Sequence, residues 1–396
     1  MMKAIIRRAT RQVGFDITRY RPEVWEAGFA SVKSPRGSRG DVLLSYVIEP
    51  FLLKRGELVS RAHTNNWESL QMAKTFLDLG YHVDTIGSYN VDFAPKKDYR
   101  VFISDRNNLE RIAKLLPEAC LKIAHLDTAH WLFNNEASYA RCLGLQSRKG
   151  VTIPNSMRLQ APNLAIEYAD YAMTLGNEFT MGTYRYANKP IIRIPMSTCV
   201  LNQWSEDKDY EACRKNFLWF GSSGMVHRGV DLLLEAFAEM PEYHLTLCGP
   251  VERETNFVKA YSRELYHSPN IHMVGWVDIA SDMFKEITQR CGCLIYPTCS
   301  EGGGGSVLTC MHAGIVPIVS YEASVDVNEE YGVLLKTCSI TDIQDAVRTA
   351  AEFPAWKLES MSRKAWEFAR ANHTRERFAD RYREAMLHIL ELHATT

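Results

Sequence analysis

Apolar residues follow two alternating patterns from about residue 41 to the end of the chain. Short continuous apolar runs predict β-strands, and segments with an apolar residue every three or four positions predict helices. This alternation is typical of βαβ units, so the sequence predicts an α/β fold with parallel sheets. The predicted strands cover residues 42–48, 81–86, 100–103, 121–125, 171–175, 191–194, 217–221, 244–248, 271–274, 293–296 and 316–319. The predicted helices cover residues 66–79, 229–239, 280–288, 305–313, 340–352, 358–371 and 375–392.

The alternation is interrupted once, by a polar and poorly periodic segment at residues 195–215. We therefore expect two Rossmann-like domains that face each other across a cleft, with ligands at the carboxyl ends of the strands. The expected first domain covers residues 41–198 and the second covers 199–374. A final amphipathic helix at 375–396 completes the chain.

Residues 1–40 differ from the rest in charge, with nine basic and three acidic side chains. Residues 2–13 place apolar side chains on one side of a helix and basic ones on the other. This pattern is typical of an interfacial anchor on anionic lipid. A solvated helix packed on its own domain fits the pattern equally well, and both interpretations stay open.

Composition narrows the class of protein. The chain has 396 residues and a formal net charge of −1, which gives no reason to expect nucleic acid as a partner. No apolar run is long enough to span a bilayer. The ten cysteines form no C-x-x-C pair, so we expect buried, reduced thiols and no metal site. These features predict a cytoplasmic protein, with any membrane contact peripheral and on the inner face.

The most informative segment follows the predicted strand at 293–296 and opens a helix. It contains Glu301, four consecutive glycines from Gly302 through Gly303 and Gly304 to Gly305, and then Ser306. Glycines let the backbone approach a ligand closely, and free N–H groups at a helix start attract an anion such as a diphosphate. Glu301 is positioned to accept hydrogen bonds from sugar hydroxyls. A flexible glycine loop without a ligand is the alternative.

A second segment, from Trp219 to Phe237, also runs from a strand through a glycine-bearing loop into a helix. It places Arg228 at the helix entry, where a guanidinium can bind phosphate oxygens bidentately. Because both segments follow strands of the same predicted sheet, we expect them at the same end of that sheet.

These two segments resemble the donor domain of GT-B glycosyltransferases, most closely the retaining group called glycosyltransferase family 4. The likeness is carried by Gly221, Arg228-Gly229 and 231–237, and then by Glu301-Gly302, Gly304, Met311, Gly314 and 317–318. It covers residues 216–392 at the level of motifs, and residues 41–195 only in architecture.

The resemblance implies roles for individual residues. Arg228 would stand where the family has a lysine that holds the donor diphosphate, and Glu301 would contact the transferred sugar. The implied donor site comprises Gly221, Ser222, Arg228, Trp276, Val277, Gly302, Gly303, Gly304, Gly305, Ser306 and Thr309. Two positions depart from the family: Thr309 stands where it has a second glutamate, and Ser222 or Ser223 where it has an arginine.

The first half offers histidines after the strand at 121–125. In the resembling enzymes a histidine of this loop faces the donor sugar, and we favour His130 over His125 because it lies further into the loop. His63 and Asn65, after the first strand, are further acceptor-side candidates. Each of these histidines has a purely structural role as its alternative.

The predicted function is transfer of a sugar from a nucleotide-diphosphate donor, UDP or GDP, to a glycan or lipid-linked acceptor of the cell envelope. No D-x-D follows a strand, so a metal-independent reaction without a cofactor is expected, and retention of configuration is implied by the resemblance only. One alternative is a catalytically inactive sugar- or nucleotide-binding module. Another is a nucleotide-sugar epimerase of the same fold, whereas a phosphorylase is disfavoured because no lysine stands in a pyridoxal-like context.

Overall fold

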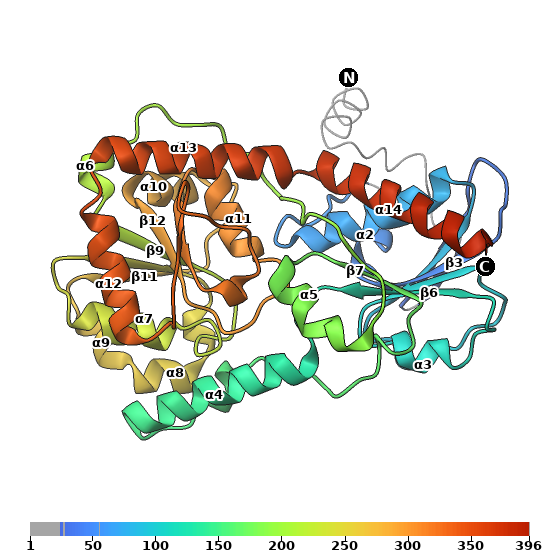
Figure 1. Ribbon diagram of the computed structural model, residues 1–396, viewed down its shortest axis with the longest axis horizontal. Coiled ribbons are helices and arrows are strands. Elements are labelled where there is room, and N and C mark those ends of the chain that lie inside the picture. The colour runs from blue at the N-terminus through green and yellow to red at the C-terminus, as the bar shows by residue number, and fades with distance from the viewer. Residues whose placement is uncertain (1–23, 27, 55, 396) are drawn as a thin grey trace. The chain divides into compact units, whose positions relative to one another are not determined.

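The computed structural model describes residues 24–26, 28–54 and 56–395, and it confirms an α/β protein with two sheets and flanking helices (Figure 1). The basic amphipathic helix expected at residues 2–13 lies outside the described residues. Contacts divide the chain into two compact units. The first comprises residues 1–125, 163–173 and 379–396, and the second comprises 126–162 and 174–378. The domain ranges expected from the sequence stay predictions.

The first sheet has the strand order β1-β2-β4-β3-β5-β6-β7-β8. The pairs of β3 with β4 and β5, and of β5 with β6, are parallel, whereas β1 and β2 pair antiparallel at one edge. The edge strands β1 and β2 were not predicted. The bounds are β1 Val24–Glu26, β2 Phe29–Val32, β3 Asp41–Tyr46, β4 His82–Gly87, β5 Val101–Ser104, β6 Leu121–Leu126, β7 Tyr171–Thr174 and β8 Ile191–Arg193.

The second sheet is parallel throughout, with the order β11-β10-β9-β12-β13-β14. Its central strands are apolar on both faces because helices cover both, which is why they read as continuous apolar runs. Phe217, Leu218 and Trp219 of β9 are fully buried. The bounds are β9 Asn216–Phe220, β10 His244–Cys248, β11 Ile271–Gly275, β12 Cys293–Tyr296, β13 Val316–Val319 and β14 Val333–Leu334.

The helices expected from the sequence are all present within a few residues, and several shorter ones are added. The bounds are α2 Thr64–Asp78, α3 Leu109–Ala113, α4 Trp131–Lys149, α5 Glu178–Tyr184, α6 Tyr210–Cys213, α7 Val230–Ala238, α8 Thr255–Ala260, α9 Ser262–His267, α10 Asp282–Arg290, α11 Gly305–His312, α12 Ile340–Ala351, α13 Ala355–Asn372 and α14 Arg375–Thr395. No described helix is long and apolar enough to cross a membrane.

The long helix α4 was not predicted, although it organises one side of the second unit. Its inner face combines apolar and polar contacts. Ala137, Cys142 and Leu145 are buried. The Ser138 hydroxyl bonds the His227 ring, and Arg141 donates to the carbonyl oxygen of Pro297 at 2.7 Å. Arg148 pairs with the buried Asp231, 2.5 Å apart. Because apolar residues also lie on the solvent side, where Leu132 and Leu143 are exposed, the sequence has no single apolar stripe that would reveal the helix.

The ten cysteines are all free thiols, and eight of them are buried. Burial raises the pKa of the Cys248 and Cys299 thiols to about 12, so these groups are protonated at neutral pH. The described residues contain no cluster of three or more groups that could hold a metal ion.

Three buried histidines join segments of the second unit through backbone carbonyls. His227 contacts the carbonyl oxygen of Ser300 at 2.7 Å, His312 that of His373 at 2.9 Å, and His373 that of Met196 at 3.2 Å. Desolvation lowers the pKa of each imidazole from 6.5 to about 4. Each ring is therefore neutral at pH 7.

The depressed histidine pKa values predict acid sensitivity. Between pH 6.5 and about 4 the three histidines bind protons in the unfolded chain but not in the folded one. The free energy of unfolding therefore falls as the pH is lowered. Each histidine contributes up to about 3 kcal/mol to this loss. Calorimetric melting temperatures from pH 7.5 to 4.5 measure this loss of stability. His312→Gln should weaken the pH dependence, and the exposed His267→Gln should not. A flat profile above pH 4.5 would contradict the interpretation.

Candidate functional site

The glycine loop between β12 and α11 packs closely against other segments of the second unit. A side chain at Gly302 would overlap the backbone of Asp127 and Thr128. Gly303 and Gly304 have φ of +153° and +58°, a region that favours glycine. Close approach and backbone geometry thus both require glycine at these positions.

Side-chain and backbone atoms of other segments also surround Gly303, Gly304 and Gly305. A Cβ on Gly303 would lie 2.7 Å from Cε of Met196, and one on Gly304 would lie 2.7 Å from the carbonyl oxygen of Ala323. At Gly305 the nearest atom would be Sδ of Met196, at 3.2 Å. The quartet expected to cradle a ligand therefore also fits the loop to its protein neighbours.

Glu301, at the start of this loop, is held by three side chains. Its Oε1 accepts from Nε of Arg228 at 2.8 Å and from the Tyr296 hydroxyl at 2.9 Å. Its Oε2 accepts from Nη1 of Arg158 at 3.4 Å. Burial by itself would raise the pKa of Glu301, but the two guanidinium groups outweigh it and lower the pKa to about 2. Glu301 is therefore a carboxylate at every physiological pH.

Arg228 links Glu301 to the loop after β9. Its Nη1 donates to the Ser222 hydroxyl at 2.5 Å and to the carbonyl oxygen of Ser223 at 2.6 Å. Burial by itself would lower its pKa, but Glu301 outweighs that effect and raises it, so the guanidinium stays charged. The arginine and Ser222, which the sequence assigned to one site, thus lie together.

Glu254 fixes the turn that carries this loop into α7. Its carboxylate accepts from the backbone N–H of Gly224 at 2.5 Å and of Met225 at 3.2 Å, and the Ser156 hydroxyl also bonds it. Gly221 lies beside the indole of Trp219, where a Cβ would be 2.8 Å from the ring. The path of the loop is therefore set by contacts on both sides.

Arg158 places a second guanidinium beside Glu301, and sequence analysis did not identify it. Its aliphatic stem covers Gly224, where a Cβ would lie 2.8 Å from Cγ and Cδ of the arginine, and its guanidinium reaches Glu301. Arg158 lies in a loop without periodicity or motif, so only the folded chain reveals its position. Glu254 was missed for the same reason, and Tyr296 was missed because its position at the end of a predicted strand does not reveal the contact of its hydroxyl with Glu301.

His130 is the first residue before α4 and is 6% exposed. Its Nε2 lies 3.0 Å from the Tyr186 hydroxyl, and its backbone N–H donates to Thr183. Its ring also contacts Tyr184 edge-on. His130 belongs to the same loop as Thr128, on which Gly302 packs, so the loop after β6 and the glycine loop are in direct contact.

The remaining predicted donor residues lie at three positions. Trp276 is 54% exposed and Val277 is buried, directly after β11. Thr309 donates its hydroxyl to the carbonyl oxygen of Gly305 one turn earlier in α11. Ser306, in the first turn of α11, is partly buried.

The acceptor-side candidates lie in the first unit. His63 is exposed and precedes α2, and Asn65 is partly buried in its first turn. His125 is 2% exposed, and its ring contacts Tyr46 edge-on at 4.6 Å between centroids. Their roles stay predictions.

Comparison with known proteins finds one matching family model, in the second half of the chain. Residues 214–352 match the family model of glycosyl transferases group 1. None of the curated protein sequences compared with the chain matches it.

Solved structures resemble nearly the whole chain. The sucrose-phosphate synthase of Thermosynechococcus elongatus has a TM-score of 0.60 at 14% identity, over 90% of this chain and 99% of that one. A glycosyltransferase from Rickettsia africae reaches 0.57 at 11% identity, over 89% and 99%. HepE of Anabaena, in complex with UDP and glucose, reaches 0.55 at 11% identity, over 89% and 100%. The chain spans about half of a further match, S. aureus TarM (54%; TM-score 0.49, 11% identity, 71% of this chain). The first three similarities confirm the predicted fold of two Rossmann-like domains.

The contact at Gly302 predicts that a single added methyl group lowers the stability of the protein. Gly302→Ala should destabilise the protein by about 1–3 kcal/mol, because its Cβ meets backbone atoms that cannot rotate away. Gly182→Ala is the matched control: it lies within α5 with no atom within 4 Å of the new Cβ, so it should be neutral or slightly stabilising. Thermal melts of both variants test this, and equal melting temperatures would refute it.

Proposed function

We propose that this chain, a glycosyltransferase with the GT-B fold, transfers a sugar from a UDP-sugar to a glycan or lipid-linked acceptor without a metal ion. The observation that carries the proposal is the pair Arg228 and Glu301, which joins the loop after β9 to the glycine loop. The match to glycosyl transferases group 1 covers both loops. We assign UDP rather than GDP as the donor nucleotide because the structurally similar HepE is bound to UDP.

The donor diphosphate is assigned to Arg228 and Arg158. The two guanidinium groups flank one carboxylate, so the three charged groups together carry a net charge of +1. Arg158 is 44% exposed in its side chain and therefore accessible to an incoming phosphate. Backbone N–H groups at the start of α11 add partial positive charge.

Arg158 also compensates for a departure from the family. The sequence has Ser222 or Ser223 where the family has an arginine, yet Arg158 supplies a guanidinium from another segment of the same unit. The loop therefore has as many positive charges near it as in the family, although one of them comes from a different position in the sequence.

Glu301 and His130 are assigned to the sugar. Glu301 is ionised and can accept hydrogen bonds from sugar hydroxyls while it keeps Arg228 aligned. His130 approaches from the loop that contacts the glycine loop. At the nucleoside, Trp276 and Val277 meet the base, and Thr309 offers its hydroxyl oxygen as an acceptor to the ribose.

In the proposed reaction the acceptor oxygen forms a bond to the anomeric carbon as the bond to the diphosphate oxygen breaks. The acceptor proton passes to the leaving diphosphate, whose growing negative charge is stabilised by Arg228 and Arg158. The protein mainly positions the reactants and neutralises charge. Retention of configuration follows from the family resemblance, and the acceptor belongs to the cell envelope, reached from the cytoplasmic face.

The first test is thermal unfolding with UDP, GDP, ADP and CMP, each with Mg²⁺ or EDTA. UDP at ~100 times its dissociation constant should add ~2.7 kcal/mol of stability, independent of metal. UDP-sugar consumption in the presence of an acceptor extract then measures turnover. A non-catalytic binding module is the second candidate, because the Glu301 carboxylate already bonds Arg158, Arg228 and Tyr296 within the protein. Nucleotide binding without any turnover would favour it.

Glu301→Gln separates binding from chemistry. The variant should keep the UDP-induced rise in melting temperature, because the diphosphate is held by the arginines. It should lose at least 100-fold in turnover, because a neutral amide orients both Arg228 and the sugar less well. The exposed Glu329→Gln is the control and should behave as wild type. Unchanged turnover in Glu301→Gln would remove Glu301 from the site.

Arg158→Gln tests the second cation. We expect UDP to bind about 10-fold more weakly, since one charge-assisted hydrogen bond contributes ~1.5 kcal/mol or more. The protein should remain folded, because Arg158 is partly exposed. Arg290→Gln, at an arginine with 80% side-chain exposure in α10, is the matched control. Calorimetric titration with UDP gives both dissociation constants, and equal values for Arg158→Gln and wild type would reject the assignment.

A further inference from the structure

His227 lies between the two loops of the candidate site, and it is 1% exposed. It directly precedes Arg228 in the loop after β9. Its Nε2 is 2.7 Å from the carbonyl oxygen of Ser300, the residue before Glu301. Its own carbonyl oxygen accepts from the backbone N–H of Cys299 at 3.0 Å. Two hydrogen bonds of one residue therefore join the segments that carry Arg228 and Glu301.

These two bonds fix the orientation of two peptide planes. The carbonyl group of Ser300 lies in one plane with the N–H and Cα of Glu301, because the peptide bond between them does not rotate. The bond from His227 to this carbonyl therefore limits the direction in which the Glu301 side chain leaves the backbone. The carbonyl group of His227 lies in the same way in the plane that leads to Arg228. Both members of the ion pair are thus aligned through His227.

The chemistry of its partners determines where the imidazole carries its proton. A carbonyl oxygen accepts but does not donate, so Nε2 of His227 must carry the hydrogen that bonds Ser300. Burial lowers the pKa of the ring to about 4, so at neutral pH the ring holds this one proton and Nδ1 is an acceptor. The Ser138 hydroxyl, 2.8 Å from Nδ1, therefore donates to it. The donors run in one direction, from Ser138 through His227 to Ser300.

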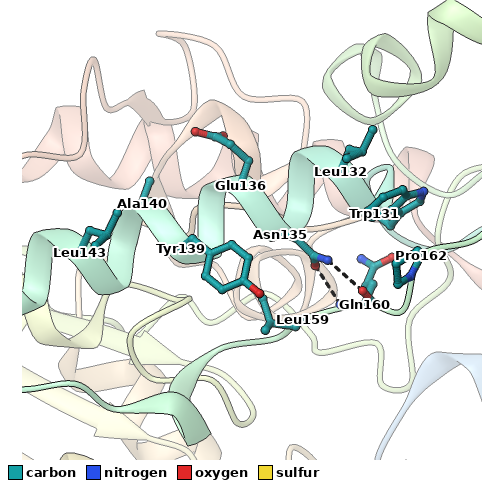
Figure 2. A pocket seen from close by; sticks show the side chains of 10 residues that line it. All are labelled: Trp131, Leu132, Asn135, Glu136, Tyr139, Ala140, Leu143, Leu159, Gln160 and Pro162. Atoms are coloured by element: carbon teal, nitrogen blue, oxygen red, sulfur yellow. Dashed lines mark hydrogen bonds between the residues drawn. The ribbon is translucent and has the colours of Figure 1, made fainter.

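Helix α4 supplies Ser138 and also anchors the loop that carries Arg158. The Asn134 side chain donates to the carbonyl oxygen of Arg158 at 2.7 Å. Asn135 exchanges two bonds of 2.8 Å with the backbone of Gln160, which Figure 2 shows as dashed lines. The second arginine of the site is therefore anchored to the helix that provides the hydroxyl for His227.

A nucleophilic pair with the neighbouring thiol is a different role for this imidazole, and the surroundings exclude it. The Cys299 sulfur lies 3.5 Å from Nδ1 of His227, and a cysteine beside a histidine is the arrangement of a thiol nucleophile. Here the cysteine is 7% exposed, and burial raises the pKa of its thiol to about 12. A thiol that is neither ionised nor accessible does not attack a sugar. His227 thus acts on its neighbours through hydrogen bonds.

We propose that His227 is a positioning residue, which aligns Glu301 with the donor sugar through the carbonyl group of Ser300. The proposal rests on the proposed glycosyl transfer, in which Glu301 accepts hydrogen bonds from the sugar. A misplaced carboxylate impairs the transition state more than it impairs binding of the diphosphate, which is assigned to Arg228 and Arg158. His227 therefore affects kcat and leaves the KM for the donor nearly unchanged.

Two substitutions test the bond from His227 to Ser300. In His227→Gln the amide nitrogen stands at the place of Nε2 and can still donate, whereas the side chain of His227→Asn is too short. Both variants keep the backbone bond to Cys299. With His227→Asn we expect kcat to fall roughly 10- to 100-fold and KM to change less than ~3-fold, and His227→Gln should restore kcat to within ~3-fold of wild type. The measurement is consumption of UDP-glucose, UDP-galactose and UDP-N-acetylglucosamine with an acceptor extract.

A double-mutant cycle separates positioning from a general structural role. Because His227 acts through Glu301, His227→Asn should lower kcat less than ~3-fold when Glu301→Gln is already present. His312→Asn is the matched control, since His312 is also buried and its Nε2 also bonds a backbone carbonyl, that of His373. The control should lower the melting temperature and leave kcat unchanged.

Nitrogen-15 NMR of the histidine-labelled protein tests the bond itself. The His227 signal, identified by its loss in His227→Gln, should be that of the Nε2–H tautomer. The Nδ1–H tautomer, a kcat of His227→Asn equal to that of wild type, or an undiminished effect of His227→Asn beside Glu301→Gln would each overturn the proposal. With wild-type turnover present, such a result rejects only the positioning role. Absence of any wild-type turnover rejects the proposed function, and the positioning role with it.

Discussion

The site depends on one buried ion pair. Arg228 is 5% exposed, and Glu301 compensates its charge in the interior. A buried pair of this kind contributes little net stability, since desolvation offsets the attraction. Removal of one partner, however, leaves the other charge buried without compensation. The pair instead fixes the position of two loops relative to each other. It holds the loop after β9 and the glycine loop in one arrangement, so a diphosphate bound as proposed would meet positive charge that is already oriented.

The surroundings of the pair restrict it further. The Tyr296 hydroxyl and Arg158 occupy the other sides of Glu301, and Ser222 receives the far end of Arg228. Behind them, His227 connects the loop to Ser138 of α4 and to the carbonyl oxygen of Ser300. Since that imidazole is neutral, it orients its neighbours without adding charge. The electrostatic potential at the site is thus set by two arginines and one glutamate.

The strands and most long helices could be predicted from the sequence because a parallel sheet covered on both faces needs continuous apolar strands. Arg228 and Glu301 could be found for a related reason, since each follows such a strand in a glycine-bearing loop. Arg158 and Glu254 could not, because their positions depend on contacts between segments that are distant in sequence. Helix α4 was missed because apolar residues lie on both of its sides, Leu145 buried and Leu132 and Leu143 exposed, so its sequence has no single apolar stripe.

The attachment of α4 has a consequence for domain exchange between related enzymes. Residues 126–162 precede the polar segment at 195–215, yet they bond the second unit through Ser138, Arg141 and Arg148. A chimaera joined at residue 199 would pair this helix with a foreign partner and leave Asp231 buried without its arginine. A recombinant that keeps the fold must therefore carry α4 together with the second unit, although the two are separated in the sequence.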